Sequence, residues 1–204
     1  MTIYHGDCRE ILPVHTDVLI TDPPYGISHA SGWESSWEGV AIVGDESTAS
    51  RDWVLARYHS HPVAVFGTWR IPAPNAARAM LVWDKGPASG MGDLSFPWKL
   101  SWECIWILGH GWRGARDEGV LKNYGIVTWE TMGRSHPHEK PVDLLRHLVL
   151  KSPPGMVLDP FMGSGTTLRA AKDLGRKAIG IEIEERYCEI AAKRMGQEVL
   201  ELGA

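Results

Sequence analysis

The sequence has few cysteines and no long apolar run, and these absences narrow the classes of protein to consider. Three cysteines occur among 204 residues and lie far apart, so neither a disulfide framework nor a zinc site is predicted. No apolar segment is long enough to cross a bilayer, and no basic segment followed by an apolar one stands at the N-terminus. We therefore expect a reduced, cytoplasmic protein without a membrane segment or a bound metal.

A surplus of positive charge is also absent. The formal net charge is −4, which argues against a surface that coats nucleic acid broadly but is compatible with a local basic stripe. Apolar residues make up 44% of the chain, so a chain of this length can bury one sizeable core. We expect a single domain over residues 1–204.

Short apolar segments alternate with segments of helical periodicity. This alternation predicts an α/β fold, namely a Rossmann-like, doubly wound, mostly parallel sheet of seven strands flanked by helices. The predicted strands are residues 2–4, 17–21, 62–66, 80–83, 103–108, 156–158 and 178–181. The predicted helices are residues 47–60, 73–79, 141–150, 166–174 and 184–195. Residues 27–45 and 110–140 lack a sustained period and are expected to be irregular.

The most informative motif is Thr-Asp-Pro-Pro-Tyr-Gly at residues 21–26, directly after a predicted strand. A proline has no backbone N–H and favours extended geometry in the residue before it. Asp22 and Pro23 both precede a proline, so the Asp22 carboxylate and the Pro23 carbonyl become neighbouring acceptors. With the Tyr25 ring beside them, they suit a flat base that carries an exocyclic amino group. A proline turn that merely ends a strand is the simpler alternative.

A second motif, Val-Leu-Asp-Pro-Phe-Met-Gly-Ser-Gly-Thr-Thr at residues 157–167, joins a strand to a helix through a glycine-rich turn. Glycines permit a tight turn and the close approach of a ligand. Glu182 ends the next predicted strand, where a carboxylate can accept hydrogen bonds from ribose hydroxyls. These features indicate a nucleotide-like cofactor, although a turn that only connects strand and helix is the alternative.

Departures from two nucleotide motifs narrow the identity of that cofactor. Thr166 stands where a phosphate-binding loop needs lysine, and Leu168 stands where the dinucleotide motif needs a third glycine or alanine. Asp159 would repel a pyrophosphate, but it suits the positively charged amino and sulfonium groups of S-adenosylmethionine. The sequence therefore favours S-adenosylmethionine.

The two motifs lie far apart in the sequence, yet each follows a predicted strand. Ligands of open α/β sheets bind beyond the carboxyl ends of the strands, where the strand order reverses. If strands 17–21 and 156–158 are neighbours at that point, the amino group and the cofactor meet in one cleft. We adopt this adjacency as a hypothesis.

Together, these motifs resemble the beta class of DNA amino-methyltransferases, a circularly permuted group in which the proline motif comes first. The compact size suits a bacterial or phage enzyme. The resemblance extends from His5-Gly6-Asp7 through Arg194, and His138 stands where the family has threonine. It implies that the catalytic residues are Asp22, Pro23, Pro24 and Tyr25. It implies that the cofactor-binding residues are Asp7, Lys140, Asp159, Pro160, Phe161, Gly163, Ser164, Gly165, Thr166 and Glu182. Among these, Asp7 would contact the adenine of the cofactor, Glu182 its ribose and Lys140 its carboxylate.

Two irregular segments are candidates for contact with DNA. The resemblance implies a target-recognition insertion before His136, and only residues 110–135 are available for it. Within it, Arg113 and Arg116 are candidate phosphate or base contacts, with a solvated loop as the alternative. Residues 27–45 contain Trp33 and Trp37, which are predicted to close over a flipped base or to wedge the duplex.

The predicted reaction is methyl transfer from S-adenosylmethionine to the N6 amino group of adenine in double-stranded DNA, by base flipping and direct in-line transfer. Transfer to cytosine N4 uses the same logic and is an alternative, although enzymes of that type often have serine at the position of Asp22. RNA, a protein glutamine amide, or a non-enzymatic DNA-binding module are more distant alternatives. No cysteine follows a proline, which disfavours transfer to cytosine C5. So short a recognition segment is compatible with a homodimer, and a restriction endonuclease is a candidate partner.

Overall fold

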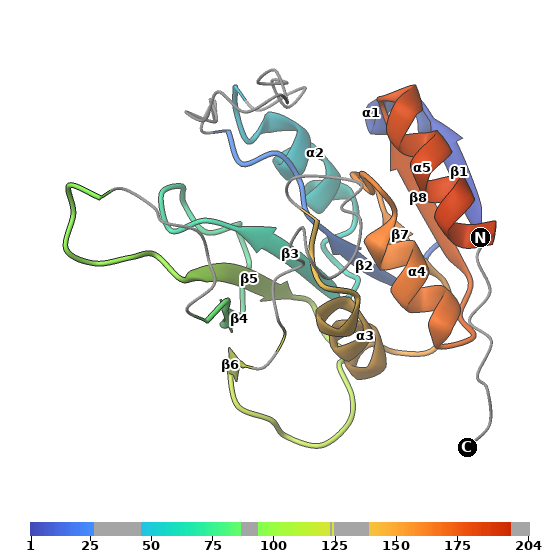
Figure 1. Ribbon diagram of the computed structural model, residues 1–204. Helices are drawn as coiled ribbons and strands as arrows, with labels where there is room; N and C mark the ends of the chain where they lie inside the picture. Colours follow the sequence, from blue (N-terminus) through green and yellow to red (C-terminus); the bar gives the residue numbers. More distant parts are fainter. Residues whose placement is uncertain (27–45, 87–93, 123, 125–138, 197–204) are drawn as a thin grey trace, which may run out of the picture.

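The computed structural model describes residues 1–26, 46–86, 94–122, 124 and 139–196, which form one sheet with helices on both faces (Figure 1). The strands are β1 (Thr2–His5), β2 (Val18–Thr21), β3 (Val63–Gly67), β4 (Ala79–Asp84), β5 (Trp102–Leu108), β6 (Val120–Leu121), β7 (Val157–Asp159) and β8 (Ala178–Glu182). The helices are α1 (Cys8–Ile11), α2 (Ala49–Arg57), α3 (Val142–Lys151), α4 (Thr166–Asp173) and α5 (Glu185–Gly196). No helix in these ranges is both long and apolar enough to span a membrane.

The strand order shows how the two ends of the chain meet. In the described part of the chain, the sheet runs β1-β8-β7-β2-β3-β5-β4-β6. β5 is antiparallel to both of its neighbours, and the other pairs are parallel. The prediction of a mostly parallel, Rossmann-like sheet is confirmed. The adjacency hypothesis is also confirmed, because β2 pairs directly with β7 through Val18 opposite Val157 and Leu19 opposite Leu158.

The central strands are buried on both faces because helices cover both. Val18 and Ile20 of β2 pack in a cluster with α3, α4 and α5, whereas Leu19 packs in a second cluster with α1 and α2. All three side chains are fully buried. Burying a side chain of this size stabilises the fold by ~1.5–3 kcal/mol. Burial on both faces also explains why these strands appear in the sequence as continuous apolar runs.

Two predictions about individual elements are wrong. The sheet has an eighth strand, β6, inside a segment predicted to be irregular, and it pairs with β4 at Val82 and Trp83. Its two residues are too few to show a period in the sequence. Residues 73–79 form no helix; they contain one turn, in which the Ala77 N–H donates to the Pro74 carbonyl at 3.2 Å. A single turn fixes several residues for one hydrogen bond, which disfavours an isolated short helix.

The sheet has two distinct ends, which decide where a ligand can bind. We define the carboxyl edge as the end at which β1, β2, β3, β7 and β8 finish. β5 begins at this edge, because Cys104 near its start lies opposite Gly67 at the end of β3. β5 finishes at the opposite, amino edge, where Leu108 lies opposite Val63. Both predicted motifs follow strands that finish at the carboxyl edge, as ligand sites in open α/β sheets do.

Candidate active site

The proline motif lies at the carboxyl edge, directly after the buried strand β2. The Tyr25 hydroxyl donates to Asp22 Oδ1 at 2.8 Å, so the motif turns back on itself. Pro23 is buried, whereas Asp22, Pro24 and Tyr25 are partly exposed. The structure therefore places the four predicted catalytic residues together at the carboxyl edge, where the Asp22 carboxylate is partly exposed to solvent.

A lysine distant in the sequence completes this group. Lys140 Nζ lies 2.6 Å from Asp22 Oδ2 and 3.2 Å from Glu103 Oε2. Lys85, just after β4, pairs with the other oxygen of Glu103. We call these five residues the proline-motif cluster: Asp22, Tyr25, Lys85, Glu103 and Lys140. Its polar atoms satisfy one another within a largely buried setting, in which Lys140 is 8% exposed.

The charges in the proline-motif cluster stabilise one another against the cost of burial. Burial alone would lower the pKa of Lys140, but the carboxylates of Asp22 and Glu103 outweigh it and raise that pKa. Burial would raise the pKa of Glu103, but Lys140 and Lys85 lower it to about 2. Burial and the Asp22 carboxylate raise the pKa of Tyr25. A charged Glu103, a charged Lys140 and a neutral Tyr25 therefore persist through the physiological pH range.

Asp159, the third residue of the glycine motif, ends β7 and is a neighbour of the proline motif. Asp159 Oδ1 accepts hydrogen bonds from the Thr21 hydroxyl at 2.7 Å and from the Phe161 N–H at 3.2 Å. Thr21 immediately precedes Asp22, so one hydrogen bond joins the two motifs. Burial raises the pKa of Asp159 to about 6, although the hydroxyls of Thr167 and Thr21 oppose that rise.

Glu182, at the end of β8, supports the same turn from the next strand. Its Oε2 accepts from the Gly163 N–H and its Oε1 from the Glu184 N–H, both at 2.9 Å. Burial raises the pKa of Glu182. We call Asp159, Gly163 and Glu182 the glycine-motif cluster. Within the described ranges, neither of its carboxylates has a salt bridge.

Two glycines of the turn have different physical roles. Gly165 adopts a left-handed conformation with φ of 82°, and a Cβ there would lie 2.8 Å from Cβ of Ala191 in α5. It therefore permits the close packing of α4 and α5. At Gly163 a Cβ would meet nothing within 4 Å, so the turn is open on that side. Of the other predicted residues, Phe161 is partly exposed, and those buried are Pro160, Ser164 and Thr166.

Lys140 and Asp7 were both implied to bind the cofactor, and the structure places them differently. The described polar contacts of Lys140 are with the proline-motif cluster, not with the glycine turn. Asp7 follows β1 at the carboxyl edge, accepts from the Arg9 N–H at 2.8 Å and caps α1. The Arg9 guanidinium lowers the pKa of Asp7. Asp7 is separated from β7 by β8 but lies next to the glycine-motif cluster, because the N–H of the preceding residue, Gly6, donates to the Glu182 carbonyl at 2.9 Å.

The two arginines among the candidate DNA contacts lie apart from both clusters. Arg113 donates its backbone N–H to the carbonyl of Lys151, the last residue of α3, at 2.7 Å. Because residues 109–116 follow the end of β5, Arg113 and Arg116 lie at the amino edge, opposite Asp22. Trp33, Trp37 and His138 lie outside the described residues.

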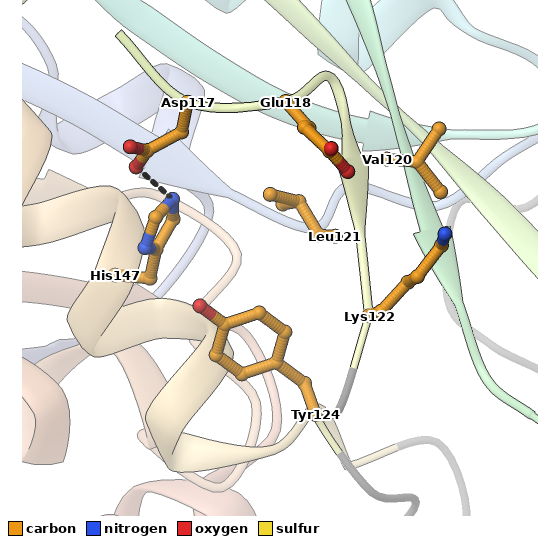
Figure 2. Close-up of a pocket in the computed structure, with 7 residues that line it drawn as sticks. All are labelled: Asp117, Glu118, Val120, Leu121, Lys122, Tyr124 and His147. Carbon is orange, nitrogen blue, oxygen red and sulfur yellow. Dashed lines mark ion pairs between the residues drawn. The ribbon is translucent and has the colours of Figure 1, made fainter. Parts of the chain in front are cut away.

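The predicted recognition segment also borders a separate pocket of about 290 Å³, shown in Figure 2. The pocket is lined by Asp117, Glu118, Val120, Leu121, Lys122, Tyr124 and His147. His147 of α3 faces Asp117, with Nε2 and Oδ2 3.8 Å apart, and burial lowers the pKa of the imidazole. No residue of either cluster lines this pocket.

Sequence reasoning missed two residues that organise the site. Glu103 was assigned only to a strand, although an acid within the apolar run Trp-Glu-Cys-Ile-Trp-Ile-Leu was a usable signal, because charges are rarely buried unless paired. Arg194 of α5 bonds the Thr166 hydroxyl at 3.2 Å and Glu139 at 2.5 Å. It thereby connects the glycine turn to the residue before Lys140, a link that no local pattern reveals.

The sheet is mostly parallel, and the glycine turn after β7 and Glu182 at the end of β8 lie on adjacent strands. The proline motif lies beside them, after β2. This arrangement defines the Rossmann-like methyltransferase class. A family model described as DNA methylase matches residues 74–193, and the chain belongs to this family. YubD of Escherichia coli (strain K12) is 30% identical over 223 residues, covering 98% of this chain and 92% of YubD.

Two further comparisons agree. The type II methyltransferase M.ScaI of Streptomyces caespitosus is 25% identical over 268 residues, covering 98% of this chain and 83% of M.ScaI. The crystal structure of the M1.HpyAVI–SAM complex superposes with a TM-score of 0.70 at 25% identity, covering 96% of this chain and 99% of that one. The protein is therefore a DNA methyltransferase, and its cofactor is S-adenosylmethionine.

The glycine-motif cluster fits this cofactor. The cofactor carries cationic amino and sulfonium groups and a ribose, which need anionic and hydrogen-bond-accepting partners. Asp159 and Glu182 supply two carboxylates that are free of salt bridges to described residues and lie beside a turn that is open at Gly163. Resident lysines instead neutralise the carboxylates of the proline-motif cluster. The chemistry of the glycine-motif cluster is thus the one that a cationic ligand requires.

Proposed function

We propose that this protein transfers a methyl group from S-adenosylmethionine to the N6 amino group of adenine in double-stranded DNA, after the base has been flipped out of the helix. The observation that carries this proposal is the buried hydrogen bond from Thr21 to Asp159. It joins the residue before Asp22 to Asp159 of the glycine motif, so the proposed amino-group site and the proposed cofactor site lie at the same edge of the sheet.

Asp22 is proposed to accept a hydrogen bond from the amino group. The lone pair of an adenine amino nitrogen is delocalised into the ring, so the nitrogen is a weak nucleophile. Acceptors at Asp22 and the Pro23 carbonyl favour a more tetrahedral nitrogen, whose lone pair then projects out of the ring plane. The Tyr25 ring stacks on the flipped base, and fixed positioning removes much of the barrier.

The glycine-motif cluster is proposed to hold the cofactor. When bound, S-adenosylmethionine supplies an electrophilic methyl group on a sulfonium centre. Asp159 attracts the positive charges, and Glu182 accepts from the ribose hydroxyls while it anchors the Gly163 N–H. Asp7, farther along the edge, is proposed to contact the adenine of the cofactor.

Adenine is favoured over cytosine by the aspartate of the proline motif, Asp22. The resemblance associates aspartate at this position with N6-adenine transfer and serine with N4-cytosine transfer, and this chain has Asp22. Both bases present a similar amino group, so N4-cytosine transfer is the second candidate.

The decisive experiment is incubation of the purified protein with radiolabelled S-adenosylmethionine and mixed unmethylated DNA and RNA. The products are then digested to nucleosides and separated. We expect the label in N6-methyl-2′-deoxyadenosine from the DNA. Label in N4-methylcytosine would overturn the base assignment, and label only in RNA would overturn the choice of nucleic acid.

A DNA surface at the carboxyl edge is proposed as part of this function. Residues 94–101, directly before β5, project from the body of the molecule in Figure 1 and include four exposed apolar side chains. These are Leu94, Phe96, Trp98 and Leu100, exposed by 78%, 55%, 70% and 47%. Apolar wedges of this kind enter base steps. Trp33 and Trp37 remain proposed contacts, while Arg113 and Arg116 would require a duplex that reaches the amino edge.

Paired substitutions test this surface. Replacing Phe96 and Trp98 with alanine should weaken binding of duplex DNA by about tenfold while S-adenosylmethionine affinity stays unchanged. Replacing Trp33 and Trp37 with alanine should weaken binding and turnover together. Fluorescence anisotropy with a labelled duplex measures both. Unchanged DNA affinity in either pair would remove that pair from the proposed surface. A homodimer or an endonuclease partner would be tested by light scattering and by co-purification.

A further inference from the structure

Both oxygens of Asp22 are already engaged. Oδ1 accepts from the Tyr25 hydroxyl at 2.8 Å, and Oδ2 lies 2.6 Å from Lys140 Nζ. If Asp22 accepts from a target amino group, as the proposed function requires, that group has to displace one of these partners. An ammonium bound to Oδ2 also neutralises the carboxylate that should stabilise positive charge developing on the amino nitrogen.

Lys140 is the partner that can leave, because a second carboxylate lies close enough to bind its ammonium. Its side chain is 9% exposed, so moving the ammonium away from every anion would leave a buried, unpaired charge. Glu103 Oε2 already lies 3.2 Å from the same nitrogen. A small rotation about the end of the lysine side chain therefore exchanges one carboxylate for another without exposing the charge. The Tyr25 hydroxyl, 3.5 Å from Glu103 Oε2, stays near both acids.

Glu103 is built to receive that ammonium. It projects from β5, where it lies opposite Trp83 of β4 and next to Cys104, which lies opposite Gly67 of β3, so its backbone is fixed by the sheet. Lys85 binds Oε1, which orients the carboxylate and leaves Oε2 toward Lys140. Lys140 and Lys85 also lower the pKa of Glu103, so the acid is ionised whenever the protein is folded at neutral pH.

We propose that Glu103 is a positioning residue that takes the Lys140 ammonium from Asp22 when the target amino group enters, freeing Asp22 Oδ2 to accept from the substrate. The exchange conserves the charges of the proline-motif cluster and forms no covalent bond. It leaves Asp22 without a resident cation at the moment when positive charge develops beside it. Asp22 touches the substrate, and Glu103 acts through Lys140.

The first test compares Glu103→Gln with Glu103→Asp. Glutamine keeps the size and one acceptor oxygen but removes the charge that attracts Lys140. We expect Glu103→Gln to lower kcat for methylation of mixed-sequence duplex DNA by on the order of 10- to 100-fold. The KM for S-adenosylmethionine should not change. Glu103→Asp, which keeps the charge on a shorter side chain, should lower kcat by less than Glu103→Gln does. The matched control is Asp173→Asn, an acid-to-amide change at the end of α4, paired with Arg169 at 2.7 Å.

The second test is a double-mutant cycle with Lys140→Met. Without the ammonium, nothing has to leave Asp22, so Glu103→Gln should change kcat by less than about twofold in that background. An equal loss in both backgrounds, or equal losses in Glu103→Gln and Glu103→Asp, would show a structural role and overturn the proposal. If Lys140→Met does not fold, the glutamine–aspartate comparison decides alone. A wild-type protein that is inactive on every nucleic acid overturns the proposed function and this inference with it. An active wild-type protein matched by Glu103→Gln overturns only the inference.

Discussion

The two clusters at the carboxyl edge handle negative charge in opposite ways. In the proline-motif cluster, Lys140 and Lys85 neutralise the acids, and the pKa of Glu103 falls to about 2. In the glycine-motif cluster, hydroxyls and backbone N–H groups bind the acids, and burial raises the pKa of Asp159 to about 6. The two lie side by side, joined through Thr21 and β2.

This difference matches what each cluster is proposed to bind. A buried carboxylate without a cation is costly, and a cationic ligand relieves that cost, so the glycine-motif cluster is complementary to S-adenosylmethionine. A neutral amino group brings no charge, so the proline-motif cluster needs resident cations to keep Glu103 ionised. Neighbouring carboxylates can thus serve two ligands because their counterions differ.

The strongest challenge to this contrast is Asp22→Ala. It removes the proposed amino-group acceptor but leaves the glycine-motif cluster untouched. We expect methyl transfer to fall by on the order of 1,000-fold, with S-adenosylmethionine affinity within about twofold of wild type. A filter-binding assay with tritiated cofactor measures transfer, and calorimetry measures binding. Normal turnover would refute the catalytic assignment, and a parallel loss of cofactor affinity would show that the clusters are not separate.

The complementary change is Asp159→Asn, which removes charge from the other cluster. The cationic cofactor loses an ionic partner, so its affinity should fall by on the order of 30-fold. Duplex DNA should bind as in wild type when the cofactor is absent. Calorimetry and anisotropy give the two affinities. Cofactor affinity equal to wild type would mean that Asp159 only shapes the turn.

The opposite pKa shifts predict opposite effects of acid. The proposed role of Asp159 requires an ionised carboxylate. Cofactor affinity should therefore fall about tenfold per pH unit below about pH 6, and Asp159→Asn should remove that dependence. The folded pKa of Asp159 lies above its ordinary value of 3.8. Protonating it therefore stabilises the cofactor-free protein by on the order of 3 kcal/mol as the pH falls from about 6 to about 4. Calorimetry between pH 5 and 8 measures the affinities.

The pKa of Glu103 is shifted in the opposite direction to that of Asp159, so acid should have the opposite effect on the stability that it contributes. Its folded pKa of about 2 lies below its ordinary value of 4.5, so its stabilisation is complete above about pH 4.5 and is lost between there and about pH 2. Urea unfolding between about pH 4.5 and about pH 2 should show a loss of stability that is smaller in Glu103→Gln than in wild type. An equal loss in both proteins would mean that Lys140 and Lys85 do not stabilise the carboxylate.

The smallest effect is expected from Thr21→Val, which removes the hydrogen bond between the motifs. Loss of a buried hydroxyl donor should destabilise the fold by ~1–2 kcal/mol. It should also raise the pKa of Asp159 further, which moves the pH dependence of cofactor binding upward. Thr16→Val is the matched control, because the Thr16 hydroxyl is also buried but donates to Val18 and Met156 carbonyls at the amino edge. Identical cofactor binding in both variants would contradict a link through Thr21.

Local patterns predicted much of the fold because the central strands and helices have strong periodic signals. The apolar run Val18–Ile20 and the stripe of α3 were sufficient to locate their elements. The same reasoning failed at β6, which has two residues, and at 73–79, where proline and a single turn disfavour a helix. Short elements depend on their neighbours more than on their own sequence.

The sites were predictable only as separate motifs. Asp22 and Tyr25 stand together in the sequence, as do Asp159 and Gly163, so spacing alone placed each pair. Lys140 was predicted to bind the cofactor, but its ammonium lies between Asp22 and Glu103. Arg113 and Arg116 looked favourable by composition, yet the antiparallel course of β5 carries them to the amino edge.

The sequence by itself determined the strand–turn chemistry of both motifs and the alternating α/β plan, because proline, glycine and hydrophobic periodicity act over a few residues. Only the tertiary structure decided which charges neutralise which. Ion pairing depends on distances through space, and β2, β5 and Lys140, two residues before α3, meet at one edge only after the sheet has formed. The assembled sheet therefore decides which cation pairs with each acid. It thereby also decides which ligand each cluster is suited to bind.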